Sequence, residues 1–160
     1  MTALRQLSLV MAPFVLAGCV ATPPPVDDDA IRREVAAYAD TIALDLRRDG
    51  PRAWLRHFER TPAFFMASGG RMEFPTYDSA DVLVEDLAKR IRSMELKWSD
   101  VRVDPLTPSL AVLAASFREV VTDTAGAAME FRGYFTAVAK RSGAGWRLRN
   151  AHWSLVPGAE

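Results

Sequence analysis

The spacing of apolar residues changes once along this 160-residue chain, and that change constrains the fold most strongly. In the first half, apolar residues recur every three or four positions, which is the pattern of amphipathic helices. In the last third they alternate with polar residues over long stretches, which is the pattern of strands. Helices followed by a run of strands indicate the α+β class with an antiparallel sheet.

Turn residues and helix-capping residues set the expected boundaries of the elements. We expect a helix over 30–49, a short helix after Pro51, and a third helix from Ser79 that carries Met94 on its inner face. Two short strands are expected at 63–67 and 71–74, around the tight turn at Gly69 and Gly70. Longer strands follow from Leu96 to Val103, with a bulge near Ser99 and Asp100, and at 110–122, 128–140 and 145–155.

The N-terminus is typical of an export signal. Arg5 precedes an apolar run that ends at Leu16-Ala17-Gly18-Cys19, and this run is about half the length that a membrane-spanning helix needs. The tetrapeptide resembles the lipobox of bacterial lipoproteins, which implies cleavage of residues 1–18 and lipid attachment to Cys19. The alternative is an ordinary signal peptide with an incidental cysteine. In that family an Asp after the cysteine favours the inner membrane, so Val20 favours the outer membrane, with the protein facing the periplasm.

Residues 19–29 are expected to form a tether. They contain three consecutive prolines followed by Asp27, Asp28 and Asp29, a composition that does not bury a core. Adjacent carboxylates repel one another, so we interpret these aspartates as helix-capping residues rather than metal ligands.

Composition excludes several classes of function. Cys19 is the sole cysteine, so no intramolecular disulfide is available. The 20 basic and 20 acidic residues balance, which argues against a nucleic-acid-binding surface. His57 and His152 are the only histidines and lack metal-ligand spacing, so we expect no metal and no cofactor.

The chain resembles the NTF2-like superfamily, in particular its SnoaL-like and DUF4440-type branch. The resemblance rests on the element order, on the Asp49-Gly50-Pro51 break, on the Gly69-Gly70 turn and on the ending at 145–154. It implies a single domain over 30–157. In that domain a strongly curved antiparallel sheet wraps three helices of the N-terminal half into a cone with a pocket.

Catalysis in such a cone requires a carboxylate or a comparable base inside it. Related sequences commonly carry an acid before the histidine of the last strand, where this chain has Ala151. His152 remains the candidate catalytic residue, because strict alternation places Trp146, Leu148, Asn150, His152 and Ser154 on one face, expected to be the inner one. The alternative is a packed histidine bonded to a backbone carbonyl or to Tyr38, in which case His152→Ala costs stability rather than activity. The candidate pocket-lining residues are Tyr38, Trp54, Phe58, Glu73, Trp98, Arg118, Asn150, His152 and Ser154.

Two functions are consistent with these features. The first is a membrane-anchored, non-catalytic lipoprotein that binds a small apolar or amphipathic ligand or a protein partner. The alternative is an isomerase, cyclase or hydrolase that uses His152 with a carboxylate the sequence does not place. We also expect a homodimer through the outer face of the sheet, where Trp153 and Leu155 project near Tyr134 and Val138.

Overall fold

The computed structural model describes residues 27–143 and 145–156, so the expected signal peptide, Cys19 and most of the tether lie outside the described residues. The elements, in chain order, are α1 (Asp28–Asp49), the 3₁₀ helix η1 (Gly50–Ala53), α2 (Trp54–His57), β1 (Phe65–Ser68), β2 (Arg71–Phe74), α3 (Tyr77–Arg90), β3 (Ile91–Thr107), β4 (Leu110–Asp123), β5 (Ala128–Ser142) and β6 (Gly145–Leu155). Among the described helices, none combines the length and the apolar character needed to cross a membrane.

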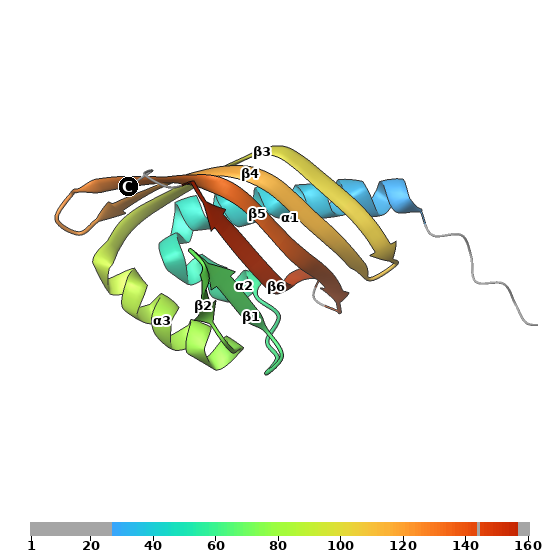
Figure 1. The fold of residues 1–160 in the computed structure, drawn as a ribbon, viewed down its shortest axis with the longest axis horizontal. Helices are drawn as coiled ribbons and strands as arrows, with labels where there is room; N and C mark the ends of the chain where they lie inside the picture. The colour runs from blue at the N-terminus through green and yellow to red at the C-terminus, as the bar shows by residue number, and fades with distance from the viewer. Residues whose placement is uncertain (1–26, 144, 157–160) are drawn as a thin grey trace, which may run out of the picture.

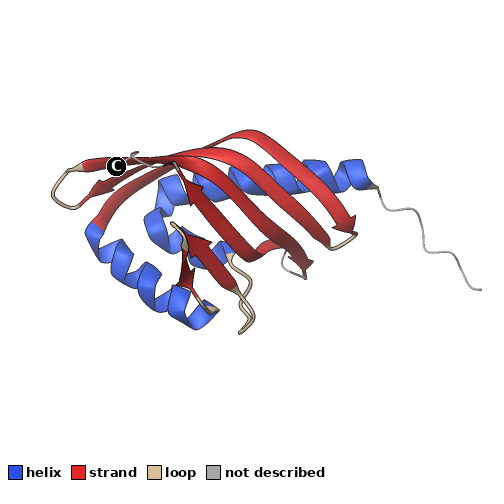
Figure 2. Cartoon of the chain, viewed as in Figure 1, coloured by secondary structure: helices blue, strands red, loops and turns tan. Residues whose placement is uncertain are grey.

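The six strands form one curved sheet in the order β2-β1-β6-β5-β4-β3 (Figure 1). Each neighbouring pair is antiparallel except β1 and β6, which run parallel, so the sheet is mixed rather than wholly antiparallel. The helices gather on the concave side of the sheet, with α1 running across the long strands (Figure 2). The expected α+β class is confirmed.

Helix α1 forms where the sequence predicts it. The side chain of Asp27 accepts a hydrogen bond from the Ala30 backbone N–H at 2.9 Å, which satisfies one of the free donors of the first turn. Gly50 ends the helix at φ 66°, a conformation that glycine adopts without strain. The apolar face of α1 is buried against the sheet, and its buried residues are Ile31, Val35, Tyr38, Ala39, Ile42 and Leu46.

Helix α3 begins and ends earlier than expected. Thr76 and Ser79 form a reciprocal capping box at its N-terminus, so the helix begins at Tyr77 rather than Ser79. The chain turns extended at Ile91, with φ −105° and ψ 124°, and continues directly into β3. Met94 is therefore a buried residue of β3, and its expected place on the third helix is wrong.

Trp153 lies at the centre of the core. Its ring packs against four other aromatic rings at centroid distances of 4.6 to 5.7 Å, namely those of Trp54, Trp98, Phe117 and Phe135. Gly133 permits the close approach of β5 and β6 beside this cluster, because a Cβ there would lie 1.8 Å from the carbonyl oxygen of Ser154. The expected outward projection of Trp153 is therefore wrong.

A bulge in β6 explains this reversal. Val138 pairs with Asn150 and Ala139 pairs with Leu148, so Arg149 is an extra residue on β6. The extra residue shifts the alternation by one position: Leu148 is buried before the bulge and Ala151 after it. His152 is consequently exposed on the outer face of the sheet.

A second bulge interrupts β3 and was expected from the sequence. The pairing of β3 with β4 shifts between Ser99 and Arg102, and Asp100 has a positive φ of 52°. The bulge predicted near Ser99 and Asp100 is confirmed.

Candidate functional site

A cavity of about 370 Å³ opens between α2, β1, β2, α3 and the inner faces of β3 to β6. Its apolar lining residues are Trp54, Phe58, Met66, Phe74, Val84, Leu87, Met94, Phe117, Phe131, Trp153 and Leu155. Its polar lining residues are Ser68, Arg71, Glu73 and Glu119. An apolar cavity with few polar groups is the usual form of a small-molecule site.

Glu119 brings a carboxyl group into the apolar wall of this cavity. It lies on β4 between Phe117 and Val121, two buried residues of the same face. Across the sheet it pairs with Leu96 of β3 and Phe131 of β5. Within residues 27–143 and 145–156, its carboxyl oxygens have no hydrogen-bond donor and no cationic partner. The group is therefore available to a ligand.

The apolar surroundings of the half-buried Glu119 side chain change its protonation. Loss of hydration disfavours the charged form and raises the pKa of Glu119 from its ordinary value of 4.5 to about 7. Near neutral pH the carboxyl is therefore present in both forms. The protonated form donates a hydrogen bond and the ionised form accepts one or removes a proton.

An ion pair on β2 contributes charge to the cavity lining. Arg71 Nε donates to Glu73 Oε2 at 2.9 Å, and both side chains line the cavity. Arg71 is largely exposed, so this pair forms a polar part of an otherwise apolar lining.

The structure brings some of the sequence-predicted site residues to this cavity. Trp54, Phe58 and Glu73 line it. Trp98 lies beside it in the core, where its Nε1 donates to the Ala39 carbonyl at 2.9 Å. Tyr38 lies elsewhere, in a hollow beside α1.

Four other predicted pocket residues lie on the outside, and their expected inward orientation is corrected. The Arg118 side chain is exposed and pairs with Glu130. Asn150, His152 and Ser154 follow the bulge at Arg149, and the alternation of β6 after this bulge places them on the outer face of the sheet. His152 therefore faces away from the cavity that contains Glu119.

The outer face of the sheet carries a shallow apolar hollow. Phe65, Val138 and His152 are among its lining residues, and Tyr134 is exposed on the same strand as Val138. Leu155 lines the inner cavity together with Trp153, so its expected outward projection is also wrong. The homodimer expected through this face stays a prediction, and without Trp153 and Leu155 it rests on Tyr134 and Val138.

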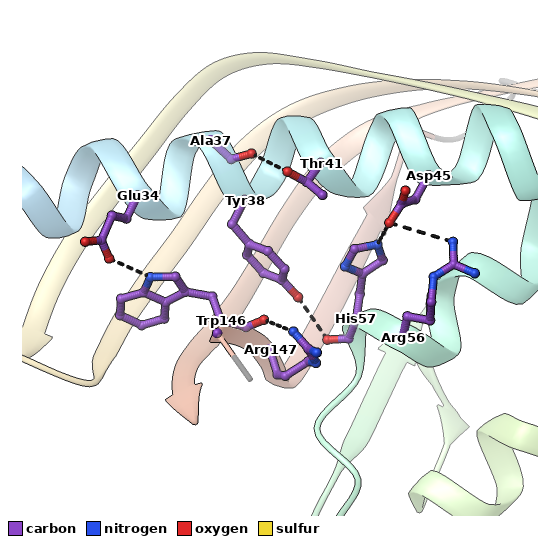
Figure 3. A pocket seen from close by; sticks show the side chains of 10 residues that line it. Glu34, Ala37, Tyr38, Thr41, Asp45, Arg56, His57, Trp146 and Arg147 are labelled. Carbon is purple, nitrogen blue, oxygen red and sulfur yellow. Dashed lines mark hydrogen bonds and ion pairs between the residues drawn. The ribbon is translucent and has the colours of Figure 1, made fainter. Parts of the chain in front are cut away.

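A hollow of about 530 Å³ lies between α1, α2 and β6 (Figure 3). His57 is buried there, and its Nε2 lies 3.0 Å from Asp45 Oδ2. Burial lowers the pKa of His57, although the Asp45 carboxylate opposes this shift. Tyr38 donates to the backbone carbonyl of His57 at 2.9 Å, so its partner is not His152.

Hydrogen bonds fix several polar side chains in the α1 hollow. The hydroxyl of Thr41 donates to the Ala37 carbonyl at 2.9 Å and is not directed at His57 (Figure 3). Burial also raises the pKa of Tyr38, which keeps the phenol protonated as a hydrogen-bond donor. The Asp45–His57 pair thus ties α2 to α1.

Sequence reasoning did not single out Glu119. The available signal was its place in the alternating pattern of the strand. Glu119 lies between Phe117 and Val121, at a position where the pattern has an apolar residue. In the part of the chain that the structure describes, no three His, Cys, Asp or Glu side chains gather as a metal site.

Comparisons with known proteins identify the fold. No protein-family model matches the sequence, and no curated protein matches it. An NTF2-like superfamily protein from Salmonella enterica superposes with a TM-score of 0.68 at 14% identity, covering 82% of this chain and 95% of that one. A ketosteroid isomerase-like protein from Erwinia carotovora gives 0.59 at 14% identity over 78% and 95% of the two chains. An NTF2-like protein of unknown function from Shewanella oneidensis gives 0.57 at 13% identity over 76% and 97%. The chain therefore has the NTF2-like fold.

Proposed function

We propose that this protein is an envelope lipoprotein whose cavity binds a small, mainly apolar ligand that carries one hydrogen-bonding group. The observation that carries the proposal is the carboxyl of Glu119, which lines the apolar cavity without a protein partner among the described residues. Glu119 is half-buried, and a carboxyl that loses part of its hydration without gaining a protein partner costs free energy, which a ligand hydroxyl or carbonyl relieves.

The chemistry of the cavity defines the class of ligand. Its aromatic and aliphatic walls favour rings or short alkyl groups. A neutral Glu119 donates a hydrogen bond to a carbonyl or hydroxyl of the ligand. A ligand carboxylate beside Glu119 is unfavourable, because these surroundings already disfavour a negative charge on Glu119 itself. Arg71, exposed in the lining, is the group suited to an acidic substituent at the solvent-facing end of the ligand.

Native mass spectrometry on the protein purified from its own host tests this proposal directly. The expected result is an extra mass of a small molecule that is absent after denaturation. Titration with a panel of steroids and aromatic ketones should also change the fluorescence of Trp54 and Trp153, which both line the cavity. Glu119→Gln should alter these affinities, while Glu130→Gln, on the outer face, should not. Equal affinities in all three proteins would contradict the proposed role of Glu119.

Proton-transfer catalysis by Glu119 is a second candidate, favoured by its pKa of about 7. A general acid or base works best when its pKa lies near the working pH. The similarity to a protein named ketosteroid isomerase-like is consistent with an isomerase, although at 14% identity it supports the fold alone. In this version Glu119 replaces His152 as the acid–base group.

Turnover on ketosteroids, epoxides and polyketide-like ketones tests this second candidate. A catalytic Glu119 predicts a pH–rate profile with a limb near pH 7 and a loss of roughly 10²- to 10⁴-fold in Glu119→Gln. His152→Ala should retain full activity because its side chain faces outward. Absence of turnover on the whole panel would favour the binding function.

The membrane location is proposed from the sequence. Lipid attachment at Cys19 and the tether over 19–29 would hold the domain at the outer membrane, facing the periplasm. Two or more acyl chains make such an anchor stable, whereas one gives only reversible binding.

A further inference from the structure

A third hollow, of about 500 Å³, lies between α2, the start of α3 and the ends of β5 and β6. It shares Arg56 and Arg147 with the neighbouring hollow beside α1 (Figure 3). We call it the arginine hollow, because Arg56, Arg60 and Arg147 line it. Phe58 and Tyr77 supply apolar surface. Neither the cavity around Glu119 nor its proposed ligand uses these three arginines.

Two of the three arginines keep free hydrogen-bond donors. Neither Arg60 nor Arg147 has a carboxylate within 4.0 Å in the described part of the chain. The Arg60 guanidinium carbon lies 5.4 Å from the centroid of the Tyr77 ring, and such stacking leaves the edge N–H groups available. Arg147 donates from Nη1 to the Trp146 carbonyl at 2.7 Å, which uses one of its five donors.

The acidic residues near the hollow form ion pairs with basic residues other than Arg60 and Arg147. Glu59 lines it, but its carboxylate meets Lys140 Nζ at 2.6 Å and Arg149 Nε at 3.1 Å. Arg56 is held by Asp49 and lies 3.7 Å from Asp45, beside the buried His57 (Figure 3). Among residues 27–143 and 145–156, no carboxylate therefore pairs with Arg60 or Arg147.

From this arrangement we infer that the arginine hollow binds a phosphate group, as a free phosphate ester or as a lipid headgroup. Guanidinium groups present paired donors that match the oxygens of phosphate and carboxylate. A carboxylate has two oxygens and fills one such pair, whereas the three terminal oxygens of a phosphate monoester accept from both Arg60 and Arg147. The dianion also matches their two charges.

Calorimetric titration with inorganic phosphate, glycerol phosphate and acetate tests the inference on the full chain. Phosphate compounds should bind more tightly than acetate, and the affinity should fall as the salt concentration rises. Arg60→Gln and Arg147→Gln should each weaken phosphate binding by roughly tenfold or more, because a charge-assisted hydrogen bond is lost. The matched control is Arg33→Gln, an exposed arginine of α1 that does not line the hollow and has no carboxylate within 4.0 Å among described residues.

Flotation with phosphatidylcholine vesicles, with and without phosphatidic acid, distinguishes the two sources of phosphate. These assays use the Cys19→Ala chain, which has no thiol to anchor it. Vesicle binding that requires phosphatidic acid and Arg60 assigns a lipid headgroup, whereas binding to glycerol phosphate alone assigns a soluble ester. Arg60→Gln keeps the test valid if the half-buried Arg147 proves necessary for folding. No binding in either assay, or equal losses in Arg33→Gln, would overturn the inference.

Discussion

Replacing Glu119 with Gln should stabilise the domain at neutral and alkaline pH. Burial raises the pKa of Glu119 in the folded protein from its ordinary value of 4.5 to about 7. Between these two pH values the folded state holds a proton that the unfolded state has released. The free energy of unfolding therefore falls as the pH rises through this window, and the full cost is present above pH 7.

The size of the effect follows from the shift. One pKa unit corresponds to about 1.4 kcal/mol, so the full shift is worth about 3 kcal/mol. The carboxyl faces a cavity that admits water, and solvation there reduces the expected gain to about 1 to 2 kcal/mol. Glutamine has nearly the same shape and no charge, so Glu119→Gln removes this cost without opening a void.

Urea unfolding of both proteins across the pH range measures this difference. The variant and the wild type should be equally stable below pH 4.5 and diverge as the pH rises to 7. Glu130→Gln is the matched control with the opposite sign, because hydrogen bonds from Arg118 and Arg132 lower the pKa of Glu130. That variant should lose stability at neutral pH, and its deficit should disappear as the pH falls. A constant difference between Glu119→Gln and wild type at every pH would contradict a raised pKa of Glu119.

Three further predictions concern the fold and the anchor. Gly133→Ala should cost about 1 to 3 kcal/mol in urea unfolding, because its Cβ would meet the Ser154 carbonyl oxygen at 1.8 Å; an unchanged midpoint would show that β6 lies farther from β5. Trp153→Ala should cost about 3 to 5 kcal/mol, whereas the exposed His152→Ala should stay within about 0.5 kcal/mol; a reversed order would place the bulge at Arg149 in doubt. Cys19→Ala should abolish palmitate labelling and membrane fractionation, since no other thiol is available; retained labelling would exclude the lipobox.

Local patterns predicted the helices and strands well because they depend on neighbouring residues. The apolar spacing and the glycine at position 50 placed α1 within two residues of its observed bounds. The end of α3 was missed because Leu87, Ile91 and Met94 continue a helical spacing into β3. The parallel pairing of β1 with β6 joins segments far apart in the sequence, so no local pattern encodes it.

The candidate site was harder to predict because one extra residue controls it. The bulge at Arg149 reverses which side chains of β6 face inward, and strict alternation therefore chose His152 over Trp153. The alternation of β4 places Glu119 on the inner face. Its apolar neighbours Leu96 and Phe131, however, come from two other strands. This environment forms only when β3, β4 and β5 pair in the folded sheet.

The pKa of the Glu119 carboxyl can be measured residue by residue in solution. Carbon-13 NMR of the glutamate-labelled chain follows each side-chain carboxyl through a pH titration, and Glu119→Gln identifies the signal by its loss. We expect a midpoint near 7 for Glu119 and a shift of that midpoint when a ligand occupies the cavity. A midpoint near the ordinary value of 4.5 would contradict the proposed role of Glu119, because it would mean that water or a charged partner already satisfies this group.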